Sequence, residues 1–178
     1  TLPSTGEEIK YRPFLVKEQK TLLMAQESKN DSETVDAMSQ LINDCTFGKV
    51  NPKVCPLFDA EYIFLKLRSK SVGEKAEVQV TCPDDEKTKV NVTINLEEIE
   101  CNVIDNHDNV VKITDTVKIV FGYPLLDSFK STDNKNQTEI MFDMVESCVK
   151  EIHYGETVYN RVDISSKGSD LYKISDDL

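Results

Sequence analysis

The pattern of apolar positions predicts helices in four segments of the chain. The first segment is residues 17–27. The second begins near Ser32, an expected N-cap, and ends at Phe47-Gly48. Residues 57–70 are apolar on nearly every side, so this helix is expected at the centre of the core. The most amphipathic helix is predicted over 137–153, with Asn136 and Glu139 at capping-box spacing.

A period of two residues predicts strands elsewhere. The clearest is a hairpin: residues 76–82 and 90–96 alternate apolar and polar around a turn at 83–87, which predicts one buried and one polar face. Shorter strands are expected over residues 7–14, 99–104, 110–121 and 157–162. Within 110–121, Val117, Ile119 and Phe121 are expected on one face.

Together these elements predict an α+β fold, with helices packed on one face of a mostly antiparallel sheet built from residues 74–121. The length of 178 residues suits a single domain, with sub-lobes 1–73 and 74–178 as the alternative division. Leu171, Ile174 and Leu178 have the spacing of a helix that is just beginning. We therefore expect a C-terminal extension beyond this point.

The charge excludes several classes of partner. The chain has 21 basic and 32 acidic residues, a net charge of −11, and its basic residues are not clustered. Nucleic-acid binding depends on clustered Lys and Arg, so we expect no nucleic-acid partner, and an acidic surface also disfavours anionic membranes. No apolar run approaches the roughly 20 residues that a membrane span needs.

Metal binding has two candidate sets of residues. Five cysteines, an odd number without CxxC spacing, favour reduced thiols. Zinc would need ligands drawn from Cys45, Cys55, Cys82, Cys101 and His107, none of which are paired at ligand spacing. The segment Asp105-Asn-His107-Asp-Asn109 could offer oxygen ligands to Ca²⁺, but it lacks the glycine and the distal Glu of an EF-hand, so an Asn/Asp turn is the expected structure.

Catalytic signals are missing from the sequence. Its six glycines are scattered and no GxSxG occurs, so neither a phosphate loop nor a serine hydrolase is indicated. The neighbouring carboxylates Glu97-Glu98, Asp84-Asp85 and Asp176-Asp177 are common in so acidic a chain and do not by themselves make an acid/base pair. We expect no enzyme activity, no cofactor and no small-molecule substrate. The Met-containing stripe of 137–154 is either core or an adaptable partner groove.

Two blocks of the sequence carry a resemblance to a known family. They are Ile9-Lys-Tyr-Arg-Pro-Phe-Leu-Val-Lys-Glu-Gln-Lys-Thr-Leu-Leu-Met-Ala-Gln-Glu-Ser28 and Pro56-Leu-Phe-Asp-Ala-Glu-Tyr-Ile-Phe-Leu-Lys-Leu-Arg-Ser-Lys-Ser-Val-Gly-Glu74. The segments Phe121-Gly-Tyr-Pro124 and Thr157-Val-Tyr159 add to them. With these blocks the chain resembles the baseplate hub and hub-assembly proteins of T-even-type contractile-tailed phages.

The resemblance implies a phage late protein that is needed to assemble the central hub of the tail baseplate. It implies a non-enzymatic, chaperone-like assembly factor whose partners are other hub-assembly proteins and the tape-measure protein. A permanent structural subunit of the hub is the alternative, and a metal-dependent enzyme a remote one. The implied location is the host cytoplasm during assembly, or the virion tail baseplate. The resemblance transfers no catalytic, metal or partner-binding residue.

Overall fold

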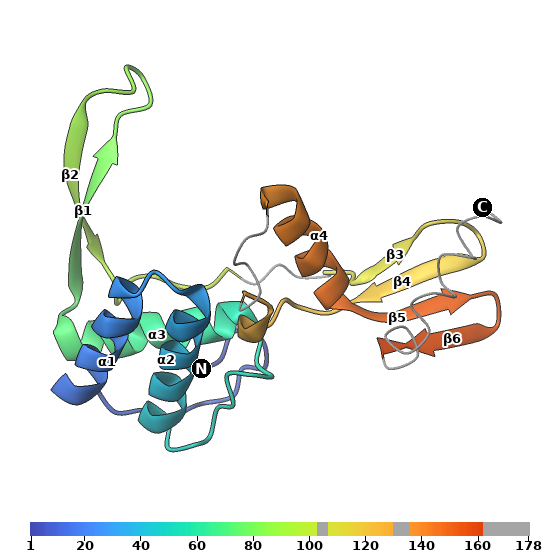
Figure 1. Ribbon diagram of the computed structural model, residues 1–178, viewed down its shortest axis with the longest axis horizontal. Coiled ribbons are helices and arrows are strands. Elements are labelled where there is room, and N and C mark those ends of the chain that lie inside the picture. Colours follow the sequence, from blue (N-terminus) through green and yellow to red (C-terminus); the bar gives the residue numbers. More distant parts are fainter. Residues whose placement is uncertain (103–106, 130–135, 162–178) are drawn as a thin grey trace. The chain divides into compact units, whose positions relative to one another are not determined.

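The computed structural model describes residues 1–102, 107–129 and 136–161 (Figure 1). The chain divides into two compact units, each treated by itself below. Unit 1 comprises Thr1–Val103 and Leu125–Asp133, and unit 2 comprises Ile104–Pro124 and Asn134–Leu178. The described residues form α-helices and two separate antiparallel sheets, so the predicted α+β class is confirmed. None of the described helices is long and apolar enough to cross a membrane.

The described residues of unit 1 form three α-helices, and all three were predicted. They are α1 (Val16–Glu27), α2 (Asp31–Cys45) and α3 (Leu57–Val72). The N-cap of α2 is Asn30 rather than Ser32, because the Asn30 side chain accepts a hydrogen bond from the Glu33 N–H at 3.2 Å. Gly73 ends α3 with φ of 140°, a conformation that a residue with a Cβ rarely adopts.

The core of unit 1 lies between α2 and α3. Ile42 and Cys45 of α2, and Ala60 and Leu67 of α3, are fully buried. The short 3₁₀ helix η1 (Leu126–Phe129) adds Leu126 to the same cluster from a distant part of the chain. The segment 57–70 therefore does contribute to the core, through one face of α3.

The first fifteen residues do not form the strand predicted over 7–14. They run as an irregular strap whose apolar side chains Leu2, Ile9 and Phe14 pack against the core cluster. The strap is fastened to the helices by hydrogen bonds from the Arg12 N–H to the Cys45 carbonyl (3.0 Å) and from the Phe14 N–H to Ser71 Oγ (2.9 Å). Its backbone thus bonds to helices and not to a neighbouring strand. The alternating pattern therefore predicted a strand where none forms.

The predicted hairpin is present in unit 1 as β1 (Lys75–Thr81) and β2 (Lys89–Asn95), in regular antiparallel register. It extends from the end of α3 away from the helices (Figure 1). The prediction that one of its faces is buried is wrong. Apart from the half-buried Ala76 and Asn95, every residue of both strands is exposed.

The described residues of unit 2 form a four-stranded sheet and one α-helix. Its elements are β3 (Val110–Lys112), β4 (Val117–Phe121), α4 (Gln137–Cys148), β5 (Val149–Tyr154) and β6 (Thr157–Asn160). The strand order is β3-β4-β5-β6, with antiparallel neighbours. The register sets Val111, Ile119, Ile152 and Tyr159 side by side across all four strands, so they share one face with Val117.

Two further expectations need correction. The helix predicted to reach residue 153 ends at Cys148, because Val149–Tyr154 pairs with β4 on one side and β6 on the other. The single sheet expected over 74–121 is in fact divided between the hairpin and the sheet of unit 2. No strand occurs at 99–102, while 103–104, 162 and the helix expected at 171–178 lie outside the described residues. The single-domain assignment, with its alternative division near Gly73, stays a prediction.

Candidate interaction surfaces

The base of the β1–β2 hairpin is fastened to α3 by one lysine. The Lys66 ammonium donates hydrogen bonds to the carbonyls of Leu96 (3.4 Å), Glu97 (3.0 Å) and Ile99 (3.1 Å). These three acceptors match the three donors of an ammonium group. The same nitrogen lies 5.2 Å from the centre of the Tyr62 ring, a distance suited to a cation–π contact. The chain leaving β2 is therefore held against the helix.

A second attachment lies one helical turn further along α3. Ser69 Oγ donates to Glu97 Oε1 at 2.5 Å, and the Lys70 ammonium lies 3.2 Å from the same oxygen. The hydrogen bond from Ser69, followed by that from Lys70, lowers the pKa of Glu97 from its ordinary value. Beside it, Leu96 is buried. Polar and apolar contacts together fix the direction in which the hairpin leaves the helices.

The turn of the hairpin is closed by Asp85. Its carboxylate accepts from the N–H groups of Lys87 (3.0 Å) and Thr88 (2.9 Å) and from the Thr88 hydroxyl. These bonds, with the Thr88 hydroxyl first, lower the pKa of Asp85 to about 2. The turn also holds Glu86 at φ of 53°. Asp85 therefore stays ionised at neutral pH and adds to the negative charge of the tip.

One face of the hairpin is apolar and uncovered by the described residues. The register places three apolar pairs directly opposite one another: Ala76 with Ile94, Val78 with Val92, and Val80 with Val90. Val80 and Val90 are each 49% exposed, and Val92 is 41% exposed. Contiguous exposed apolar surface on a soluble protein commonly marks an interaction site. We call these six residues the valine face.

The opposite face and the tip are polar. Glu77, Gln79, Asn91 and Thr93 alternate with the apolar residues, and Gln79 and Asn91 hydrogen-bond across the strands at 3.3 Å. Asp84, Asp85 and Glu86 follow one another in the turn. Across residues 74–98 seven acidic side chains stand against three lysines. The valine face is therefore bordered by negative charge.

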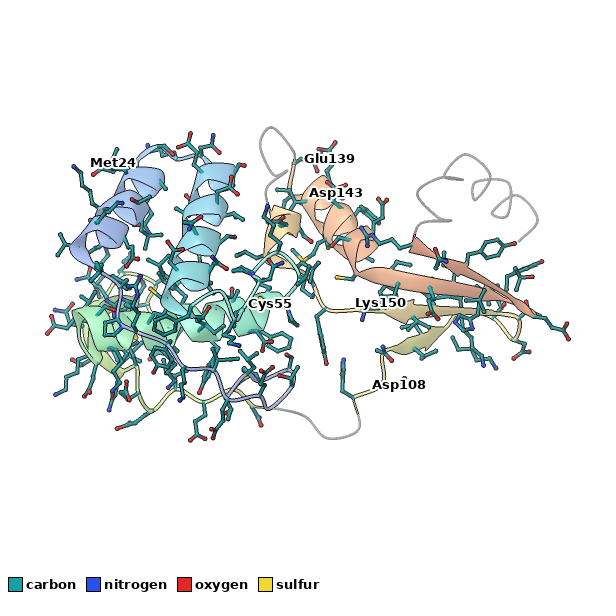
Figure 2. The ribbon with its side chains drawn as sticks, turned by 90° about the horizontal axis from the view of Figure 1, so that it is seen from below. Met24, Cys55, Asp108, Glu139, Asp143 and Lys150 are labelled. Carbon is teal, nitrogen blue, oxygen red and sulfur yellow. The ribbon has the colours of Figure 1, made fainter. Side chains whose placement is uncertain are left out.

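A second apolar surface lies on α4 in unit 2. The capping box predicted from Asn136 and Glu139 is present, with the Glu139 N–H donating to Asn136 Oδ1 at 3.0 Å and the Asn136 N–H to Glu139 Oε2 at 2.9 Å. None of the residues of α4 is fully buried. Met141, Phe142 and Val145 are at least half exposed. Glu139 and Asp143 project from another part of the same helix (Figure 2).

The sequence predicts the Met-containing stripe of 137–154 as either core or partner groove. Ile140, Met144 and Cys148 are half-buried and Met141 and Val145 are exposed, so the stripe is divided along its length. The half-buried residues contribute to packing, and the exposed ones form an uncovered apolar surface on α4.

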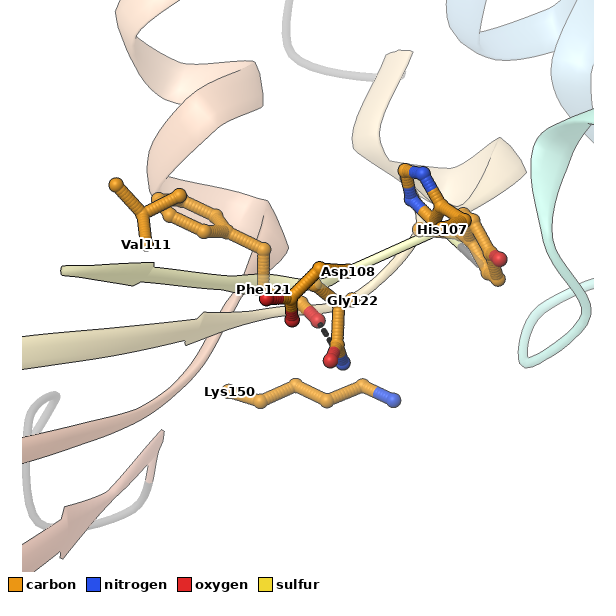
Figure 3. A pocket seen from close by; sticks show the side chains of 8 residues that line it. His107, Asp108, Val111, Phe121, Gly122 and Lys150 are labelled. Atoms are coloured by element: carbon orange, nitrogen blue, oxygen red, sulfur yellow. Dashed lines mark hydrogen bonds between the residues drawn. The ribbon is translucent and has the colours of Figure 1, made fainter. Parts of the chain in front are cut away.

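A pocket of about 290 Å³ lies at the end of the sheet in unit 2 (Figure 3). The rings of His107 and Tyr123 stack at 6.2 Å on its rim, and the aliphatic chain of Lys150 passes so close to Gly122 that a Cβ there would collide with it. Asn109 Nδ2 donates a hydrogen bond to the Phe121 carbonyl at 3.0 Å, so this side-chain amide helps to hold the walls of the pocket together. The pocket offers a hollow with mixed polar and apolar walls.

The candidate metal ligands do not come together in the described part of the chain, where no three His, Cys, Asp or Glu side chains form a group that could hold an ion. Cys45 is buried, Cys101 is exposed, and Cys55 and Cys82 lie between these extremes. Burial raises the pKa of the Cys55 thiol to about 11. For the Ca²⁺ candidate, Asp108 Oδ1 accepts from the Val110 N–H at 2.9 Å in a local turn, and Asp105 lies outside the described residues.

The adjacent carboxylates have structural partners of their own. Glu97 binds Ser69 and Lys70, Glu98 accepts from Asn95 Nδ2 at 2.6 Å, and Asp85 closes the hairpin turn. Asp176 and Asp177 lie outside the described residues. Sequence reasoning missed the exposure of the valine face and the role of Lys66. A hint of the first was available, because the face holds only Ala, Val and Ile, without a large aromatic side chain to anchor it in a core.

Comparison with known proteins places the chain. No curated protein and no solved structure matches it. Residues 1–173 match the family described as T4 bacteriophage base plate protein, which agrees with the resemblance carried by residues 9–28 and 56–74. Since this match covers nearly the whole chain, the protein belongs to the T4 bacteriophage base plate protein family.

Proposed function

We propose that this baseplate protein is a non-enzymatic, chaperone-like assembly factor of the baseplate hub. It binds other hub-assembly proteins, the tape-measure protein, or both, in the host cytoplasm. The observation that carries this proposal is the valine face, displayed on a hairpin whose base is fastened to α3 by Lys66, Ser69 and Lys70.

The form of the hairpin supports binding as its role. A two-stranded hairpin is marginally stable on its own, because it cannot bury enough apolar surface. Here the attachment to α3 holds the base of such a hairpin, while Val78, Val80, Val90 and Val92 remain accessible. An element that is anchored at one end and apolar along an exposed side is well suited to capture a partner that then covers it.

A permanent subunit of the hub is the second candidate, and the same face favours it in one respect. Apolar side chains exposed over both strands are a liability for aggregation, and a partner that never leaves would remove it. The two candidates make opposite predictions for the mature virion. An assembly factor departs, whereas a subunit remains at fixed stoichiometry.

Quantitative mass spectrometry of purified tails and of lysates from infected cells separates the two. The assembly factor is expected to be abundant in the lysate and absent from finished tails. A fixed low copy number in tails would establish the subunit instead. Both candidates fail if a phage lacking the protein assembles normal baseplates. Restoring the wild-type chain from a plasmid is the matched control for that deletion.

A further inference from the structure

We propose that the valine face is the docking site for an amphipathic helix of another baseplate protein, and that basic residues of this helix lie beside the acidic turn of the hairpin. This proposal rests on the proposed function and specifies the chemistry of the partner. The features that carry it are the width and length of the face, its exposure and the charges that border it.

The dimensions of the face suit a helix. Neighbouring strands lie about 4.8 Å apart, so two strands with their side chains form a strip about as wide as an α-helix, roughly 10 Å. At about 3.3 Å per residue, the three pairs from Ala76 to Val80 span about 13 Å, which a helix covers in about two and a half turns. All six side chains are Ala, Val or Ile, and they form an even surface without a protruding aromatic ring.

Addition of a strand to the hairpin would not cover this face. Among the described residues β1 and β2 pair only with each other, so an extended segment could in principle bond to either outer edge. A third strand would lie in the plane of the sheet and leave Val78, Val80, Val90 and Val92 exposed. Only a layer stacked on the face removes these side chains from water.

Charge argues against a second copy of this chain as that layer. Residues 74–98 have seven acidic side chains and three lysines, and the whole chain has a net charge of −11. Two hairpins stacked face to face would bring these acidic borders together. Helix α4 is no better a match, since its twelve residues include Glu139, Asp143 and Glu146 and no Lys or Arg. A basic partner helix satisfies both the apolar and the acidic parts of the hairpin.

Site-specific crosslinking tests the proposal in infected cells. A photoreactive amino acid is placed at Val80, on the valine face, and for control at Gln79, on the opposite face of the same strand. The crosslinked peptide is then sequenced. The expected product, from Val80 alone, is a segment of another baseplate protein with apolar residues at a spacing of three and four and a net positive charge.

Other products overturn the proposal. These are a crosslink between two copies, a crosslink to this chain's own residues, a partner peptide with alternating polarity or net negative charge, and no product above that from Gln79. The first of them would identify the face as a dimer interface. Strand addition would be identified by an alternating peptide.

A pair of variants gives an independent measurement. Val78→Thr with Val92→Thr replaces one cross-strand pair by isosteric polar residues that keep β propensity. Gln79→Thr with Asn91→Thr changes the neighbouring pair on the polar face. We expect the first double variant to lower the yield of the Val80 crosslink at least tenfold and the second to leave it within twofold. Equal yields from the two would contradict the proposal, provided that circular dichroism shows both to be folded.

The outcome also separates this inference from the proposed function. If the valine-face variant assembles baseplates as well as wild type while deletion of the protein abolishes them, the docking inference is wrong and the assembly role stands. If deletion has no effect, the assembly role itself is wrong.

Discussion

Lys66 is the residue on which the hairpin's attachment depends most directly. Its ammonium serves three carbonyls at the exit of β2, none of which has a place in the strand pairing of the hairpin. We expect Lys66→Met, which keeps the aliphatic chain, to lower the free energy of unfolding by about 1.5–3 kcal/mol, the usual contribution of hydrogen bonds to a charged group.

Urea titration measures this effect, and hydrogen exchange localises it. The Leu96 N–H, which donates to the Glu74 carbonyl at 2.7 Å, should exchange faster in Lys66→Met. Lys89→Met, at the exposed start of β2, is the matched control and should change stability by less than about 0.5 kcal/mol. A hairpin base that exchanges as slowly in Lys66→Met as in wild type would show that Ser69 and Lys70 suffice.

Glu18 makes the stability of the N-terminal strap dependent on pH. Its two oxygens accept from Arg12 at 2.6 and 3.0 Å, and Oε2 also accepts from the Leu15 N–H at 2.6 Å. The hydrogen bond from Arg12 is the main cause that lowers the pKa of Glu18 below 4.5. A lowered pKa in the folded state stabilises the protein above the unfolded value, and this contribution is lost as the pH falls through the folded value.

We therefore expect Glu18→Gln to lower the urea midpoint at neutral pH. The difference from wild type should stay constant down to about pH 4.5 and then close as the pH falls further. Urea titrations between pH 7 and pH 2 check this. Glu8→Gln, an exposed change in the same strap, should follow the wild-type curve. A difference that persists unchanged at the lowest pH would mean that Glu18 acts through its shape and not its charge.

At the scale of elements, the cap of α4 supports a helix that buries little. Because no residue of α4 is fully buried, packing contributes less to it than to α2 or α3. We expect Asn136→Ala to destabilise α4 locally by about 1 kcal/mol. Amide exchange of Glu139, whose N–H donates to Asn136 Oδ1, should rise about fivefold, while Gln137→Ala leaves it unchanged. Equal exchange in both variants would show that α4 does not depend on its cap.

The sequence predicted the elements better than it predicted their surroundings. The three helices of unit 1 and the hairpin were found because each has a local signal, either apolar residues within a helix-length segment or strict alternation along a strand. The segment 137–153 was predicted as one helix because Cys148, Val149 and Ile152 fit helical spacing. Val149 and Ile152 are also β-branched, and pairing with β4 and β6 selects the strand. Local pattern cannot contain that information.

The exposure of the hairpin also could not be predicted from the local sequence pattern. Alternation at 76–82 and 90–96 correctly sorts the side chains onto two faces, but it does not say whether anything covers the apolar one. Likewise, Lys66 gave no signal in the sequence, because its three acceptors are backbone carbonyls about thirty residues away. The candidate surface could be assembled only once the register and the attachment to α3 were known.

At the scale of the whole molecule, the chain returns to unit 1 after contributing β3 and β4 to unit 2. Leu125 and Leu126 follow the last strand residue, Phe121, by only a few positions, yet Leu126 is 3% exposed within the core of unit 1. Leu125 also bridges to Pro56 at the start of α3. Unit 1 therefore depends on a segment that lies after part of unit 2 in the sequence, so residues 1–103 alone would lack a core residue.

We expect Leu126→Ala to leave a cavity beside α2 and α3 and to cost about 2–5 kcal/mol. If the two units open as separate cooperative regions, amide exchange should rise in α2 and α3 but not in β4 and β5, although Leu126 is close in sequence to β4. Ile119→Ala, in the apolar row of unit 2, is the mirror control and should raise exchange in β4 and β5 alone. A uniform rise over both units in either variant would mean that they unfold as one, because a cavity in one region would then lower the stability of every slowly exchanging amide equally.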